Sequence, residues 1–273
     1  MSTHHKLWLL AIAVMASAAP LKAQETIPLL GLTNTVWKYL QAQCPDGTGW
    51  EQTSYDDAAW PSGLAMLAFE NNPAIAPLIH TVLQPPSVLN GGAVYFRTHF
   101  KWTNPTVTVT LEFSNRVDDC SAIYLNGILL TNAGVSGSPI TCTNFGRAAI
   151  TGDAISPEVF RIPATLLAGT NVLAAEVHQM NAASGDVVWG CSLNVVLPRM
   201  SIGVAGSEVN ICWTAERGVT YRVEYRSDLD TGTWTTLQDC LSSTETTACI
   251  SESVGAVPKG FYRVIITNCV TPP

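Results

Sequence analysis

The sequence is poor in charged residues, and the few that it has are mainly acidic. Only 13% of its 273 residues are Asp, Glu, Lys or Arg, and acidic residues outnumber basic ones by 21 to 14. Proteins that bind nucleic acid or anionic membranes favour a basic surface, so neither partner is expected. Hydrophobic residues make up 47% of the chain, which argues against disorder.

Common catalytic and metal-binding signatures are absent from the sequence. It contains no G-x-S-x-G, no H-E-x-x-H, no phosphate loop and no dinucleotide-binding glycine pattern. It has no C-x-x-C pair, so its eight cysteines lack zinc-finger spacing. We therefore expect no catalytic activity and no catalytic residues.

No apolar run is long enough to span a membrane, and the longest candidate lies at the N-terminus. His4, His5 and Lys6 precede a largely apolar segment at 7–19, and Ala23 precedes Gln24. This order is typical of a secretory signal peptide over residues 1–23, whereas a membrane span needs about 20 apolar residues. We expect a mature protein that is secreted, either extracellular or periplasmic.

Eight cysteines in an exported chain predict disulfide bonds. They fall into two groups of four around residue 198: Cys44, Cys120, Cys142 and Cys191, then Cys212, Cys240, Cys249 and Cys269. Four cysteines on each side indicate two disulfides in each half, and each half allows three pairings. The shorter loops favour Cys120–Cys142 and Cys240–Cys249, which leaves Cys44–Cys191 and Cys212–Cys269.

Alternating apolar residues and turn signals predict an all-β protein of two domains. Strands are expected over 94–100, 107–113, 122–125, 128–130, 171–179 and 187–197, with a two-residue turn at Asn126-Gly127 and an irregular segment over 37–70. Without intervening helices, these strands favour an antiparallel β-sandwich over residues 24–198. The alternation restarts over 209–213, 221–225 and 262–266, which indicates a small second β domain over 199–273.

A series of motifs in residues 37–197 carries a family resemblance. In chain order they read YDDAAWPSGLA at 55–65, YFRTHF at 95–100, VDD at 117–119, YLNG at 124–127 and LLAGTNVLAAEVHQ at 166–179. This series resembles the galactose-binding-like jelly-roll module, and it is similar to the sugar-binding domain of family 2 glycoside hydrolases. Residues 206–266, with CWTA at 212–215, YRVEYRSDL at 221–229 and FYRV at 261–264, resemble a fibronectin type III-like domain of secreted bacterial proteins.

The resemblance implies a galactose-binding-like jelly-roll β-sandwich followed by a small fibronectin type III-like β-sandwich. It also implies a secreted, non-catalytic binding or adhesion module whose ligand is a carbohydrate, such as an extracellular glycan. Two alternatives stay open. One is a structural or protein-interaction component of the cell surface, which would bind a cell-surface protein. The other is an accessory fragment of a glycoside hydrolase.

Four residues are candidates for ligand binding. Trp50 and Trp60 offer flat π faces on which a sugar ring could stack, although tryptophans of small sandwiches are most often core. His178 ends an expected strand, and Asp186 follows in the next loop. For His178 the alternative is a structural role, in which its ring holds the loop 180–186 by hydrogen bonds.

Asp118 and Asp119 are the candidate ligands of a structural calcium ion. Calcium takes several oxygen ligands from flexible loops, and Asp186 or Asp153 could complete the set. The alternative is that the two carboxylates accept hydrogen bonds that hold the Asn126-Gly127 hairpin. Neighbours on a strand point to opposite faces, so this pair does not form the facing carboxylates of a glycosidase.

Overall fold

The computed structural model describes residues 25–86, 92–147, 154–205, 208–253 and 260–267. The expected signal peptide, Asp153 and Cys269 lie outside these residues. Within them the chain consists of strands and loops, apart from one short 3-10 helix, η1 (Ala76–Leu78). None of the described segments is a helix of the length and hydrophobicity that a membrane span requires. The predicted all-β class is confirmed.

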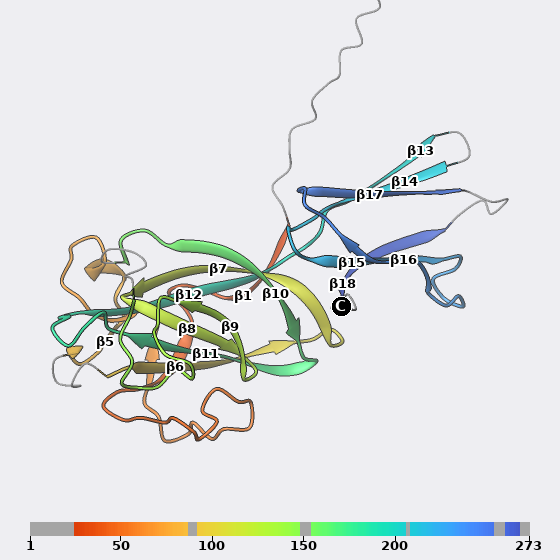
Figure 1. Cartoon of the computed structure of the whole chain (residues 1–273). Helices are drawn as coiled ribbons and strands as arrows, with labels where there is room; N and C mark the ends of the chain where they lie inside the picture. Colours follow the sequence, from red (N-terminus) through yellow and green to blue (C-terminus); the bar gives the residue numbers. More distant parts are fainter. Residues whose placement is uncertain (1–24, 87–91, 148–153, 206–207, 254–259, 268–273) are drawn as a thin grey trace, which may run out of the picture.

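Two sheets face each other to form the larger sandwich (Figure 1). The first sheet runs in the order β10 (Glu158–Leu166), β7 (Val107–Asp118), β12 (Val187–Val196), β4 (Leu67–Phe69) and β5 (Thr81–Val82), and β1 (Thr26–Leu30) also pairs with β12. The second sheet runs β3 (Ser62–Leu64), β2 (Val36–Leu40), β6 (Val94–Trp102), β11 (Gly169–His178), β8 (Cys120–Leu125) and β9 (Ile128–Ala133). β4 and β5 are parallel, and the other pairings described in these sheets are antiparallel.

Aromatic side chains fill the space between these two sheets. Trp189 of β12 stacks on Phe96 of β6 with ring centroids 5.4 Å apart, and it meets the edge of Trp37 of β2 at 5.3 Å. All three side chains are fully buried. Because they come from both sheets, their burial holds the sandwich closed.

The predicted Asn126-Gly127 hairpin joins β8 to β9. Both turn residues have positive φ, 52° and 86°, as a type I′ turn requires. The Asn126 side chain ties the turn to β11, because its Oδ1 accepts the N–H of Val172 and its Nδ2 donates to Oδ1 of Asn171. The amide side chains of Asn126 and Asn171 therefore hold the hairpin. Asp118 and Asp119 precede β8 and the turn follows it, so the expectation that these carboxylates hold the hairpin is wrong.

The segment 37–70 is more regular than the sequence suggested. β2 pairs with β6, and β4 pairs with β12, so both strands belong to the sheets of the larger sandwich. Strands of three to five residues show too little alternation to be recognised from sequence. The longer predicted strands, in contrast, are confirmed as β6, β7, β11 and β12.

A smaller sandwich follows in the chain. One of its sheets runs β13 (Met200–Ala205), β14 (Glu208–Thr214), β17 (Thr247–Ser253), and the other runs β16 (Thr235–Ser242), β15 (Thr220–Arg226), β18 (Phe261–Thr267). Its core includes Trp213 and Tyr221, whose ring centroids lie 5.8 Å apart. The strands predicted over 209–213, 221–225 and 262–266 are confirmed as β14, β15 and β18, whereas β13, β16 and β17 were not expected.

An ion-pair group lies where the two sandwiches meet. Arg161 of β10 donates to Glu112 of β7 at 2.8 Å and to Glu216, which follows β14, at 2.7 Å. Burial disfavours the charge on Arg161, but hydrogen bonds to both carboxylates outweigh it and raise the pKa of Arg161. One guanidinium thus contacts both sandwiches.

Candidate functional site

Three carboxylates meet at one end of the first sheet. Phe69 of β4 pairs with Val187 of β12, so the next residues outward, Glu70 and Asp186, lie opposite each other. On the other side of β12, Val188 pairs with Asp118, the last residue of β7. Three strand ends therefore bring Glu70, Asp118 and Asp186 together, and we call these residues the carboxylate cluster.

Each member of the carboxylate cluster offers an oxygen atom within 4.8 Å of the oxygens of the other two. Asp118 is buried, with 4% of its surface exposed, and Glu70 and Asp186 are half-buried. Glu70 accepts the N–H groups of Asn71 and Asn72 with Oε1, both at 2.6 Å. Its Oε2 is buried and has no hydrogen-bond partner among the described residues. A set of close carboxylate oxygens of this kind is suited to a hard cation.

A pocket of about 340 Å³ opens beside the carboxylate cluster. Its lining combines apolar and acidic side chains: Ala68, Phe69, Glu70, Asn71, Ile79, Val82, Gly185 and Asp186. We call it the Phe69 pocket. Phe69 is 37% exposed and Val82 is 76% exposed, so apolar surface remains open to solvent there. The pocket thus places an aromatic ring next to carboxylate and amide oxygens.

Asp119 lies apart from its neighbour Asp118. Its Oδ2 accepts the backbone N–H of Met180 at 2.7 Å and the hydroxyl of Ser184 at 3.0 Å. These bonds hold the loop between β11 and β12, which carries Asp186. Of the two predicted calcium ligands, the structure brings Asp118 into the carboxylate cluster and turns Asp119 to the loop. Ser184 donates a hydrogen bond to Asp119 and so helps to hold this loop.

His178 lies in the interior with both ring nitrogens hydrogen-bonded. Nδ1 is 2.8 Å from the carbonyl oxygen of Asn144, and Nε2 is 3.0 Å from Oε2 of Glu176. The other oxygen of Glu176 accepts the hydroxyl of Tyr124 at 2.6 Å. His178 is fully buried, so it holds the loop at Asn144 and presents no atom to a ligand.

Trp50 and Trp60 are also buried, at 5% and 6% exposure. Trp50 packs edge-on against Tyr95 and Tyr124, with centroids 4.8 and 5.5 Å away. Trp60 packs against Tyr55 in the same way at 5.8 Å. Neither indole offers an open face for a sugar ring, so the described structure favours the core role for both residues.

A buried arginine explains why these tryptophans are covered. Arg97 of β6 donates through Nε to Oδ2 of Asp57 at 2.8 Å and through Nη1 to the backbone carbonyl of Trp50. Its guanidinium also lies over the ring of Tyr55, 5.2 Å from the centroid. Arg97 is fully buried and fastens the segment between β2 and β3 onto the outer face of the second sheet.

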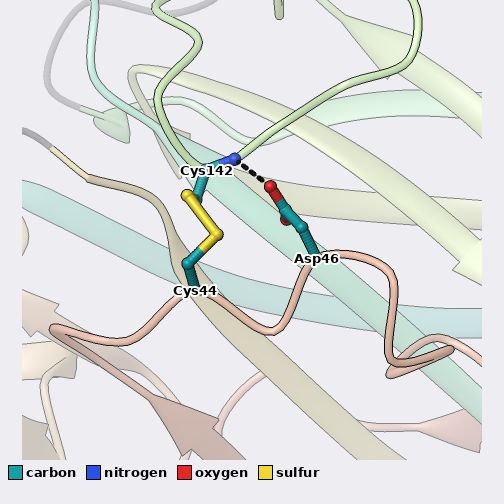
Figure 2. Close-up of side chains that lie close together, drawn as sticks. All are labelled: Cys44, Asp46 and Cys142. Atoms are coloured by element: carbon teal, nitrogen blue, oxygen red, sulfur yellow. Dashed lines mark hydrogen bonds between the residues drawn. A yellow bond between two sulfur atoms is a disulfide. The ribbon is translucent and has the colours of Figure 1, made fainter.

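A disulfide also holds the segment between β2 and β3, which contains these tryptophans. Figure 2 shows Cys44 bonded to Cys142, with the Asp46 carboxylate beside them accepting the backbone N–H of Cys142 at 2.9 Å. The other Asp46 oxygen accepts the hydroxyl of Tyr95 at 3.2 Å. The two sulfurs and the carboxylate lie close enough for a metal site, but the sulfur atoms are already bonded to each other.

The preferred disulfide pairings are wrong. Cys44 bonds Cys142, although shorter loops favoured Cys120–Cys142 and left Cys44–Cys191. Cys212 bonds Cys249, which excludes Cys212–Cys269 and Cys240–Cys249. The reason is register: Cys212 and Cys249 are direct partners on β14 and β17, and strand pairing is independent of loop length.

The second disulfide predicted for the first group of four cysteines is wrong as well. Cys120 of β8 and Cys191 of β12 are buried and belong to no disulfide, because the partners expected for them, Cys142 and Cys44, are bonded to each other. The Sγ of Cys120 lies 3.7 Å from Sδ of Met180, and burial raises the pKa of the Cys191 thiol. Cys240 is disulfide-bonded, whereas Cys269 lies outside the described residues.

Sequence reasoning missed Phe69, Glu70 and Asn71. They follow a three-residue strand inside a segment that was expected to be irregular, and no motif marks them. Of the carboxylate cluster, only Asp118 and Asp186 were identified from the sequence. A single cue was available, namely that Phe69-Glu70-Asn71-Asn72 sets an aromatic residue before three polar ones at a turn.

The comparisons with known proteins give structural likeness alone. No protein-family model matches the sequence, and no curated protein matches it. A glycosyl hydrolase family 2 member from Bacteroides cellulosilyticus is 12% identical, with a TM-score of 0.39, and the match covers 86% of this chain and 31% of that one. A β-glucuronidase from glycoside hydrolase family 2 is also 12% identical, with a TM-score of 0.39, and the match covers 91% and 27%.

A third solved structure, the β-glucuronidase from Ruminococcus gnavus, is 8% identical with a TM-score of 0.38, and the match covers 90% of this chain and 43% of that one. The chain therefore spans less than half the length of these hydrolases. At such identities and TM-scores, the role of the site has to be inferred from this chain's own residues.

Proposed function

We propose that the chain is an exported, non-catalytic binding module whose ligand is a carbohydrate held in the Phe69 pocket. The observation that carries the proposal is an exposed aromatic ring in the same pocket as Glu70, Asn71 and Asp186. An aromatic face packs against the C–H face of a pyranose, and carboxylate and amide oxygens accept hydrogen bonds from its hydroxyls. The pocket volume of about 340 Å³ lies within the range of small-molecule sites.

The proposal includes that the chain has no catalytic activity. The Oγ of Ser184 donates to Asp119, and both nitrogens of the buried His178 are engaged, so neither residue supports a nucleophile and its base. The two carboxylates that line the pocket, Glu70 and Asp186, offer oxygen atoms within 4.8 Å of each other, which leaves no room for a sugar ring between them. A glycosidase pair faces across the scissile bond from opposite sides of the sugar.

Export and domain structure complete the proposal. Residues 1–23 would act as the signal peptide, residues 24–198 as a galactose-binding-like jelly roll, and residues 199–273 as a fibronectin type III-like domain. Disulfides such as Cys44–Cys142 and Cys212–Cys249 persist in oxidising compartments, which supports an extracellular or periplasmic location.

A glycan array probed with the oxidised full-length chain tests the proposal, followed by calorimetry of each glycan that binds. We expect Phe69→Ala and Asn71→Ala each to weaken binding about tenfold, which corresponds to about 1.4 kcal/mol. Leu229→Ala is the control, because Leu229 is an exposed apolar residue in the smaller sandwich. The proposal fails if no glycan binds, or if both pocket variants bind as tightly as the control. Binding of a protein ligand instead would support the alternative of a cell-surface interaction component.

A further inference from the structure

We propose that the carboxylate cluster of Glu70, Asp118 and Asp186 binds one calcium ion, which fixes the acidic wall of the Phe69 pocket. The ion site stands on these three residues alone. Its effect on carbohydrate binding rests on the proposed function. The site keeps Asp118 and Asp186 from the sequence expectation and replaces Asp119 by Glu70.

The spacing of the oxygens fits a single ion. Calcium binds oxygen at 2.3–2.6 Å, so two ligands on opposite sides of the ion lie up to about 5 Å apart. The cluster oxygens lie within 4.8 Å of one another, so all three carboxylates can reach the same ion. Backbone carbonyls and waters supply the remaining ligands at sites of this kind.

Glu70 provides a second observation that is independent of the clustering. Its Oε1 is satisfied by two backbone N–H groups, whereas Oε2 is buried and has no hydrogen-bond partner in the described part of the chain. A buried carboxylate oxygen without a partner is costly. Beside it lies Asp118, itself 4% exposed, so the repulsion between these two groups is poorly screened by water. A bound cation would satisfy the oxygen and neutralise the repulsion together.

The ligand set favours calcium over other divalent ions. All three ligands are carboxylates, whereas zinc prefers nitrogen and sulfur. Magnesium requires near-octahedral geometry at about 2.0–2.1 Å and retains several waters, which suits a half-buried group of three side chains less well. Calcium accepts irregular arrangements of six to eight oxygens.

The position of the ion gives it a role in shaping the pocket. Asp119 holds one end of the loop between β11 and β12 through Met180 and Ser184, and an ion bound by Asp118 would hold the other end at Asp186. Adjacent carboxylates would thus anchor both ends of the loop that lines the Phe69 pocket. Ligand binding at the pocket then depends on calcium.

Thermal unfolding of the full-length oxidised protein tests the ion site without any sugar. After chelator treatment, we expect calcium to raise Tm by about 5–10 °C at a hundredfold excess over Kd, and magnesium at equal ionic strength to raise it much less. Glu70→Gln and Asp186→Asn should abolish the calcium shift. Asp118→Asn should do the same, and the other two variants keep the test valid if its burial prevents folding. Asp230→Asn, at an exposed turn in the smaller sandwich, is the matched control and should keep the full shift.

Two outcomes would overturn the ion site: no calcium-dependent shift in the wild type, or an undiminished shift in both Glu70→Gln and Asp186→Asn. A calcium shift without glycan binding supports the ion and counts against the carbohydrate proposal. Glycan binding that is unchanged by chelator supports the carbohydrate proposal and removes the coupling.

Discussion

His178 and Glu176 form a buried pair on β11, with Nε2 and Oε2 3.0 Å apart. The opposite ring nitrogen faces the carbonyl oxygen of Asn144, which can only accept, so Nδ1 must donate there. This pair connects the second sheet to the loop that carries Cys142, and its role is structural.

Replacing His178 should destabilise the fold without a direct effect on ligand binding. In His178→Ala, the Glu176 carboxylate and the Asn144 carbonyl each lose a buried partner, which costs about 1–3 kcal/mol or more. Urea unfolding measures the loss. His99→Ala is the control, because the His99 side chain is 41% exposed and should change stability by no more than about 0.5 kcal/mol. Equal stability of the two variants would contradict the buried role of His178.

Tyr95 should make the protein less stable at high pH. Burial raises the pKa of Tyr95, and the negative charges of Glu176 and Asp46 raise it further. Above the ordinary tyrosine pKa of about 10, the unfolded chain releases this proton and the folded chain retains it. The stabilisation is therefore complete below pH 10 and declines above it, by up to about 1.4 kcal/mol per pH unit for each such proton.

Unfolding free energies between pH 9 and 11 check this expectation. Tyr95→Phe should flatten the decline, although it also loses the hydrogen bond to Asp46 and starts from a lower stability. A slope unchanged by Tyr95→Phe would show that other groups release the protons. Tyr124 contributes in the same direction, because burial and the neighbouring Glu176 raise its pKa.

The two buried cysteines should react only after unfolding. Cys120 and Cys191 belong to no disulfide and are fully buried, so a maleimide should leave the native protein unlabelled. In denaturant without reductant, peptide mapping should find the label on these two residues. Label on Cys44 or Cys212 under the same conditions would contradict the disulfides described above.

Asp119 should stabilise the loop between β11 and β12 and leave the calcium response intact. Asp119→Ala removes the acceptor of the Met180 N–H and the Ser184 hydroxyl, and a loss of about 1–2 kcal/mol is expected. Melting curves with and without calcium measure both effects. Complete loss of the calcium shift in Asp119→Asn, which keeps an acceptor oxygen, would mean that Asp119 is itself a ligand.

The sequence predicted the elements whose signal is local. Long alternating strands such as 107–113 and the Asn126-Gly127 turn were identified because period-two burial and positive φ act over a few residues. The three-residue strands β3 and β4 were missed, since partners distant in the chain determine them. The disulfides follow the same rule: Cys212 and Cys249 are 37 residues apart but direct partners in register.

The site was only half predictable for the same reason. Asp118 and Asp186 stood out as acidic residues at strand ends, but Glu70 joins them only because β4 pairs with β12. Trp50 and Trp60 were candidates for stacking on a sugar, although tryptophans of small sandwiches are most often core. The contact that decided between these roles, Arg97 with Asp57 and the Trp50 carbonyl, joins segments about 40 residues apart.

The final prediction is that residues 24–198 fold without the smaller sandwich. Each sandwich has its own buried cluster, one around Trp37 and Trp189 and the other around Trp213. At the junction, removing the smaller sandwich takes Glu216 from Arg161 but leaves Glu112 as its partner at 2.8 Å. A partly exposed ion pair contributes at most about 1 kcal/mol, and the larger sandwich keeps its own core, so the fragment should unfold cooperatively. Oxidative expression, near-ultraviolet circular dichroism and melting curves of the fragment check this.

In the full chain, Glu216→Gln provides the matched test and should cost less than about 1 kcal/mol. An unfolded fragment, or a much larger loss in Glu216→Gln, would mean that the two sandwiches form one cooperative unit.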